Sequence, residues 1–246
     1  MKGKIFMAVK LKGRNFEIVA SAVVFDKDGT LTQGMRVWRK IFEKQMEVSK
    51  EMNLKIEDRA KEIFGVEIDE PYIPLAIAYS SEEKTLLAAS IWLSHHLPWD
   101  KCRETASQIV KKALEKMSDD ELFEPVKGAK EAIEKISKNV PVAIATSDSK
   151  ENVKHLLKNW NLESNVSYVI TSSEVKEGKP APYMLQKICE FFDLKCSQIL
   201  MIGDNEVDVE MAKRAGTKIV SVGRRLNGVD GWIENFEDLE ISRVDS

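Results

Sequence analysis

Two aspartates, Asp26 and Asp28, stand directly after an apolar run in the stretch VVFDKDGTL, residues 23–31. The apolar run predicts a short buried strand, and Gly29 begins the turn that follows it. Both carboxylates then lie at the carboxyl end of a strand, where open parallel sheets place their ligand sites. Two carboxylates that converge on one small volume repel each other unless a cation neutralises them. The pair therefore predicts a site for a hard divalent ion such as Mg²⁺.

Three later apolar runs also end on polar groups suited to phosphate or metal. Thr146 ends the run PVAIAT, and its hydroxyl can donate to a phosphate oxygen. Lys179 lies in the turn EGKPAP after the run SYVIT, and Asp204 follows ILMIG, with Asp208 one helical turn further on. Taken together with the first pair, these groups predict a metal-dependent phosphoryl-transfer site.

Each of these signals has a structural alternative when it is taken alone. Thr146 is followed by a helix, so Asp148 or Ser149 next to it could serve only as the cap of that helix. An exposed lysine is ordinarily solvated, and Asp208 could only complement the positive end of a helix dipole. The agreement of four strand ends favours the functional interpretation.

The elements that must position these residues fall into two kinds of pattern. From about residue 35 to 122 the periodicity is helical, in the segments VWRKIFEKQMEVSKEM, EDRAKEIFG, SEEKTLLAASIWLSHHL and DKCRETASQIVKKALEKM. From residue 124 onward, helices alternate with short β-rich runs, a rhythm typical of a parallel sheet with right-handed crossovers. The first strand belongs with this second part, so the helical block is an insertion at its carboxyl end, lying over the site as a cap.

The predicted fold class is therefore α/β, a doubly wound, parallel, Rossmann-like sheet core with an inserted all-helical cap domain. The core would comprise residues 1–33 and 124–246, and the cap residues 34–123. The pattern KIFMAVKLKGRNFEIV, residues 4–19, predicts an N-terminal β-hairpin that turns at residues 12–15 and extends an edge of the sheet.

Composition narrows the class of partner. Lys and Arg number 37 against 40 Asp and Glu, so the net charge of -3 argues against nucleic acid or an anionic membrane as the main partner. A small-molecule substrate is expected instead. No apolar run approaches the roughly 18 residues of a membrane span, and the N-terminus lacks the apolar core of a signal peptide. These features predict a cytoplasmic protein.

The three cysteines, Cys102, Cys189 and Cys196, are irregularly spaced and form no CxxC pair. This spacing predicts reduced, structural thiols and neither a disulfide framework nor a zinc site. The 31% charged content, which is dominated by Lys and Glu, leans toward a heat-adapted source.

The four motifs, in this order, resemble those of the haloacid dehalogenase superfamily. They are VVFDKDGTL, Thr146 after its apolar run, Lys179 in GKPAP, and GDNEVD. The resemblance spans the whole α/β core, and it points to the branch whose helical cap follows the first strand, which includes phosphoglycolate-phosphatase-like hydrolases.

This resemblance implies a phosphoric monoester hydrolase with defined catalytic residues. Asp26 would be the nucleophile that forms an aspartyl-phosphate, and Asp28 the general acid and then base. Thr146 and Lys179 would bind the transferring phosphoryl oxygens.

The resemblance also implies a metal set of Asp26, Asp28, Asp204 and Asp208, with Mg²⁺ as the cofactor. Asp26 and Asp204 would coordinate through their carboxylates and Asp28 through its backbone carbonyl. Asp208 would anchor metal-bound water or Lys179. The expected partner is a small phosphorylated metabolite, with no nucleic acid and no membrane.

The sequence leaves several alternative functions open. A sugar-phosphate mutase of the same superfamily is the leading one, and a non-catalytic phosphate-ligand-binding or regulatory protein is another. A dehalogenase is disfavoured, because a leaving halide needs no proton and dehalogenases lack an aspartate at the place of Asp28. Phosphonate cleavage would need a cap lysine, and protein phosphatase activity is disfavoured by the cap.

Substrate contacts are expected from a polar and aromatic cluster in the cap. It comprises WLSHHLPWD, residues 92–100, together with Arg36, Trp38 and Arg39. The structural alternative is that Trp92 and Leu93 belong to the cap core and that His95 and His96 only end a helix.

Overall fold

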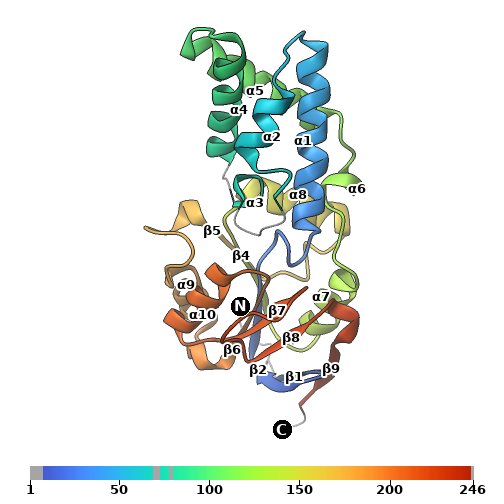
Figure 1. The fold of residues 1–246 in the computed structure, drawn as a ribbon. Coiled ribbons are helices and arrows are strands. Elements are labelled where there is room, and N and C mark those ends of the chain that lie inside the picture. Colours follow the sequence, from blue (N-terminus) through green and yellow to red (C-terminus); the bar gives the residue numbers. More distant parts are fainter. Residues whose placement is uncertain (1–7, 69–72, 78–79, 245–246) are drawn as a thin grey trace. The chain divides into compact units, whose positions relative to one another are not determined.

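The computed structural model describes residues 8–68, 73–77 and 80–244 and divides into two compact units (Figure 1). One unit combines Met1–Gln33 with Pro125–Ser246, and the other is Gly34–Glu124. The chain therefore leaves the first unit after residue 33 and returns to it at residue 125. The functional division into a catalytic core and a substrate-binding cap stays a prediction.

A six-stranded parallel sheet forms the centre of the first unit, in the order β5-β4-β3-β6-β7-β8. The strands are β3 (Ala22–Phe25), β4 (Val142–Thr146), β5 (Tyr168–Thr171), β6 (Ile199–Gly203), β7 (Lys218–Val222) and β8 (Gly231–Ile233). The chain moves from β3 outward to β4 and β5 and then returns to the other side of β3 for β6. This reversal makes the carboxyl end of β3 the place where such a sheet binds its ligand.

Helices cover the sheet, and every residue of β3, β4 and β6 is buried. The covering helices are α7 (Ala129–Ser137), α8 (Lys150–Trp160), α9 (Tyr183–Phe192) and α10 (Glu206–Ala215). Ala22 and Val24 pack with apolar residues of α9 and α10, whereas the alternating Val23 and Phe25 point to the opposite face. The doubly wound α/β fold predicted from the sequence is confirmed.

The second unit is built from α1 (Gly34–Glu51), α2 (Glu57–Phe64), α3 (Pro74–Ile77), α4 (Ser80–His95), α5 (Trp99–Glu115) and α6 (Asp119–Leu122). Its core is a cluster of buried apolar residues in which the Phe42 and Phe64 rings lie 5.5 Å apart. Among the described residues of this unit no strand occurs, as the helical periodicity predicted. None of the described helices combines the length and apolar character of a membrane span.

The N-terminal hairpin is present, but it does not extend the parallel sheet. β1 (Val9–Gly13) and β2 (Phe16–Ala20) pair antiparallel, and β1 also pairs with β9 (Glu240–Arg243) in a separate three-stranded sheet. The expected edge extension is therefore wrong. The short, mostly exposed sequence EISR of β9 carries little β pattern, so its pairing with β1 is decided by tertiary contacts. Residues 4–7 of the predicted hairpin lie outside the described residues.

The prediction of reduced thiols is wrong for Cys189 and Cys196, which form a disulfide with Cα atoms 5.5 Å apart. Cys189 lies in the last turn of α9, and Cys196 begins a short 3₁₀ helix, Cys196–Gln198. Asp193 ends α9 in the left-handed conformation at φ 55°, which folds the chain back toward the helix. Spacing alone does not reveal this reversal. Cys102 is a buried free thiol.

We expect Cys196→Ser to lower the free energy of unfolding by about 2 kcal/mol, because the disulfide restricts a short loop of the unfolded chain. Urea unfolding of the variant and of wild type, with and without reductant, measures this loss. Reduced wild type is the matched control and should unfold at nearly the same urea concentration as the variant. Coinciding curves for oxidised wild type and Cys196→Ser would contradict the expectation.

Candidate active site

Asp26 lies at the carboxyl end of the central strand β3. Its neighbour Phe25 is in register with Ile144 of β4 and Ile202 of β6, and the Asp26 amide donates to the Ile202 carbonyl at 2.9 Å. The Asp26 side chain is only 8% exposed. The sheet therefore holds this carboxylate between the ends of its two neighbouring strands.

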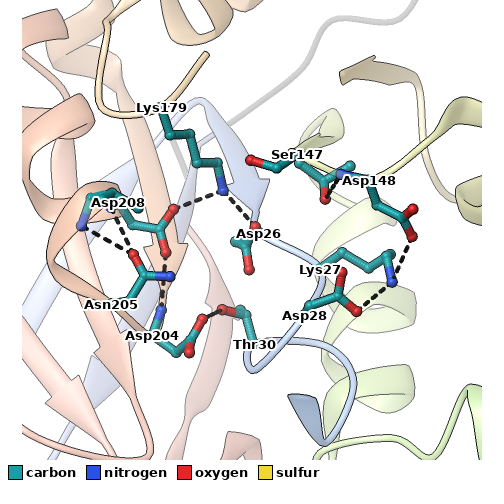
Figure 2. Close-up of polar contacts among 12 residues, drawn as sticks. Asp26, Lys27, Asp28, Thr30, Ser147, Asp148, Lys179, Asp204, Asn205 and Asp208 are labelled. Carbon is teal, nitrogen blue, oxygen red and sulfur yellow. Dashed lines mark hydrogen bonds and ion pairs between the residues drawn. The ribbon is translucent and has the colours of Figure 1, made fainter. Parts of the chain in front are cut away.

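Lys179 connects Asp26 to Asp208 (Figure 2). Its Nζ atom lies 2.5 Å from Asp26 Oδ1 and 2.7 Å from Asp208 Oδ1, and all three side chains are buried. The two carboxylates raise the pKa of Lys179 against the opposing effect of burial, so the ammonium stays charged. Lys179 reaches them from the loop that precedes α9.

Asp26, Asp204 and Asp208 form an acid cluster whose oxygens lie within 4.8 Å of one another. Burial raises the pKa of Asp26, and burial together with the charges of Asp26 and Asp208 raises that of Asp204 well above its usual range. One lysine cannot neutralise three carboxylates. An all-oxygen donor set with excess negative charge fits a hard divalent cation such as Mg²⁺.

Gly29 permits the close approach of Asp204. A Cβ atom at position 29 would lie 2.2 Å from Asp204 Oδ2, and the Gly29 φ of +87° is left-handed. The Thr30 hydroxyl donates to Asp204 Oδ1 at 3.0 Å. The turn after β3 thus leaves room for the Asp204 carboxylate at the end of β6 and orients it.

Asp208 does more than complement a helix dipole. The N-cap of α10 is Asn205, whose side chain accepts the Val207 and Asp208 amides. The Asp208 carboxylate is fully buried and turns toward Lys179 and toward the Asp204 amide, which donates to it at 3.3 Å.

Asp28 is turned away from the acid cluster. Its Oδ1 atom accepts the ammonium of Lys27 and, at 3.2 Å, the hydroxyl of Thr32. Burial raises the pKa of Asp28, and the charge of Lys27 opposes that shift. The geometry brings Asp26, Asp204 and Asp208 together as possible metal ligands, and the Asp28 carboxylate does not join them.

Thr146 ends β4 and is almost fully buried at 1% exposure. Its Oγ1 atom accepts the Asp148 amide at 3.1 Å, which tightens the turn into α8. The hydroxyl hydrogen is left for another acceptor. A phosphate-binding role for Thr146 stays a prediction.

Three polar residues of this region escaped the sequence argument as functional groups, namely Lys27, Thr30 and Asp148. The sequence indicates only a helix-capping role for Asp148, but Ser149 caps α8 by accepting the Asn152 amide. Asp148 instead pairs with the buried Lys27 at 2.9 Å. One feature of the sequence points to a role for Lys27, namely its position between Asp26 and Asp28 directly after a buried strand.

The expected substrate cluster of the second unit makes contacts within that unit. His95 Nε2 accepts the Lys55 amide at 3.2 Å, and the rings of Trp92 and His96 meet edge to face. Arg36 pairs with Glu124 at 2.8 Å. A role for these residues in substrate binding stays a prediction.

The sequence model of haloacid dehalogenase-like hydrolases matches residues 20–216, and the chain belongs to this family. Pyrophosphatase PpaX of Bacillus mycoides is 34% identical over 110 residues, which cover 44% of this chain and 51% of that protein. PpaX of Bacillus anthracis is 34% identical over 119 residues, covering 48% and 55%. The chain spans about half the length of these curated relatives.

Solved structures of the family share the fold. A subfamily IA hydrolase from Geobacter sulfurreducens has a TM-score of 0.60 at 23% identity, covering 88% of this chain and 92% of its own. A mutant of CbbY from Rhodobacter sphaeroides, in complex with xylulose-1,5-bisphosphate, has a TM-score of 0.56 at 17% identity, covering 88% and 95%. A 2-haloacid dehalogenase from Pseudomonas syringae has a TM-score of 0.64 at 16% identity, covering 88% and 94%. Because dehalogenases share this fold, the site must decide the reaction.

Proposed function

We propose that this protein is a Mg²⁺-dependent phosphatase that hydrolyses a small phosphorylated metabolite through an aspartyl-phosphate on Asp26. The observation that carries the proposal is the buried Asp26 carboxylate at the end of β3, 2.5 Å from Lys179 and grouped with Asp204 and Asp208. A nucleophilic carboxylate beside a fixed cation suits attack on phosphorus.

In the proposed first step, the carboxylate of Asp26 attacks phosphorus and the ester bond to the leaving oxygen breaks. Lys179 holds the nucleophile in place and supplies positive charge close to the transferring phosphoryl group. Asp208 holds Lys179 from its other side at 2.7 Å, so the ammonium keeps its position during the reaction.

The residues proposed to hold the metal are Asp26 and Asp204, with Asp208 beside them and the backbone carbonyl of Asp28 as a further oxygen donor. When bound, Mg²⁺ supplies positive charge that screens the phosphate from the nucleophile. Thr30 and Gly29 contribute by fixing the position of Asp204.

Asp28 is proposed to protonate the leaving oxygen and then to accept a proton from the water that attacks the aspartyl-phosphate. This residue separates a phosphatase from a dehalogenase, because a halide leaves without a proton. Thr146 is proposed to donate its hydroxyl hydrogen to a phosphoryl oxygen.

Pyrophosphate is the second candidate substrate, because the PpaX proteins that resemble this chain are named pyrophosphatases. A phosphate leaving group and an alkoxide leaving group need the same nucleophile and cation. The proposal includes a cytoplasmic location, since charged phosphate esters cross membranes poorly and are found inside cells. The disulfide is unusual for that compartment outside heat-adapted organisms.

The test is hydrolysis of p-nitrophenyl phosphate, pyrophosphate and a panel of phosphorylated metabolites, with Mg²⁺ and with EDTA. We expect turnover with Mg²⁺ to exceed turnover with EDTA by at least ~10²-fold, because charge screening at phosphorus is worth several kcal/mol. Restoration by excess Mg²⁺ is the control for damage by EDTA. Inert wild-type protein would overturn the proposal in favour of a mutase or a binding protein, and turnover indifferent to EDTA would remove the metal from it.

A further inference from the structure

Lys27 is a buried ammonium between two carboxylates (Figure 2). Its side chain is 6% exposed, and its Nζ atom contacts Asp28 Oδ1 and lies 2.9 Å from Asp148 Oδ2. A buried charge is costly unless it is paired, and two partners meet that requirement here. The pairing joins the turn after β3 to the turn after β4.

Asp148 is itself fixed by α8. Its Oδ1 atom accepts the Ser149 amide at 2.6 Å and the Asn152 side-chain amide at 2.8 Å. Its other oxygen, Oδ2, is the one that Lys27 contacts. Asp148 thus gives Lys27 a rigid anchor, because both of its oxygens are held by defined donors.

The contacts of Asp28 are one-sided. Lys27 and Thr32 both donate to Oδ1. Across the described ranges of the chain, the structure gives Oδ2 of this carboxylate no donor. One oxygen is therefore held by two donors, and the other accepts from none of the described residues.

We propose that Lys27, anchored by Asp148, is a positioning residue that holds Asp28 Oδ1 so that Oδ2 exchanges the proton with the leaving group. This inference rests on the proposed phosphatase reaction. As Asp26 bonds to phosphorus, the phosphorus–oxygen ester bond breaks, and the leaving oxygen takes the proton from Asp28 Oδ2. Water then attacks phosphorus, its proton passes to Asp28, and the bond to Asp26 breaks to release phosphate.

In this role, the contribution of Lys27 to the reaction rate depends on the basicity of the leaving group. An alkoxide is a strong base and needs the proton as it departs, whereas p-nitrophenolate is a weak base and departs with little help. kcat/KM reports events up to departure of the leaving group, and kcat also includes hydrolysis of the aspartyl-phosphate. A purely structural role for Lys27 would lower the rate for every ester alike.

The experiment compares Lys27→Met with wild type on p-nitrophenyl, phenyl and benzyl phosphate, which are similar in size and increase in leaving-group basicity. We expect kcat/KM for benzyl phosphate to fall about 10²-fold, the lower end of general acid catalysis, and that for p-nitrophenyl phosphate to fall at least about tenfold less. Hydrolysis of the aspartyl-phosphate also needs Asp28, and kcat includes this step whereas kcat/KM does not. For p-nitrophenyl phosphate, kcat should therefore fall more than kcat/KM, which means that KM falls as well.

Asp148→Asn is the second variant, since it is nearly isosteric and its Oδ1 atom can still accept both amides. Asp148→Asn should lower kcat/KM most for benzyl phosphate and least for p-nitrophenyl phosphate, as Lys27→Met does. The loss should be smaller, about tenfold for benzyl phosphate. Lys150→Met is the matched control, because Lys150 begins α8 two residues after Asp148 and pairs with Glu174 at 2.8 Å. The kcat/KM values of Lys150→Met for the three esters should equal those of wild type.

An equal loss on all three esters, or no loss on benzyl phosphate, would overturn the role of Lys27. Failure of wild type to hydrolyse any of the three would overturn the proposed function instead. If Lys27→Met does not fold, the ester dependence of Asp148→Asn decides the inference by the same criterion.

Discussion

Asp26→Asn is expected to lower hydrolysis of p-nitrophenyl phosphate by at least ~10⁴-fold, because the amide cannot form the aspartyl-phosphate. The replacement is nearly isosteric, so the sheet around it is unchanged. Steady-state turnover at saturating Mg²⁺ measures the loss.

The same variant should be at least as stable as wild type when Mg²⁺ is absent. Burial raises the pKa of Asp26, which means that the folded state disfavours its charged form at neutral pH. Lys179 keeps Asp208 as its partner in the variant. Urea unfolding in EDTA measures this, and Asp58→Asn on the exposed first turn of α2 is the control. Turnover close to wild type in Asp26→Asn would rule out the aspartyl-phosphate.

Lys179→Met is expected to destabilise the protein by about 3–5 kcal/mol in the absence of Mg²⁺, as removal of one member of a buried ion pair does. The change leaves the buried carboxylates of Asp26 and Asp208, and the partly buried carboxylate of Asp204 beside them, without a cation. Activity should fall as well, by about 10²–10³-fold, because the variant loses a fixed positive charge at phosphorus.

Mg²⁺ should recover part of the lost stability in Lys179→Met, because the ion binds the folded acid cluster and not the unfolded chain. Adding Asp208→Asn to Lys179→Met should also recover stability, since it removes one of the unpaired charges. Lys154→Met, an exposed position on α8, is the control for loss of a lysine. Wild-type stability in Lys179→Met would contradict the buried pairing that the structure describes.

The positions of the candidate residues along the sheet could be predicted from the sequence, because the strands of a parallel sheet have a recognisable pattern. Buried strands are short apolar runs, and the residue after each run lies at the carboxyl end of the sheet. Asp26, Thr146 and Asp204 were located in this way, and the structure places them at the ends of β3, β4 and β6. The roles assigned to them stay predictions.

The contacts that orient these groups could not be predicted by the same rule. Lys27 and Asp148 come from different loops, and their pairing depends on the path of each loop after its strand. Asp208 has two possible partners by sequence, metal-bound water and Lys179, and the structure shows its contact with Lys179. Side-chain direction at a strand end is decided by long-range packing.

The sequence by itself determined the α/β core, the helical insertion and the order of four chemically suited strand ends, because period and composition act over short stretches of chain. Only the tertiary structure decided the Cys189–Cys196 disulfide, the pairing of β1 with β9, and the close approach of Asp204 to Gly29. Each of the last two joins residues more than 170 positions apart. The disulfide depends on a reversal of the chain at Asp193. Such contacts depend on turn geometry and strand register, which no local pattern encodes.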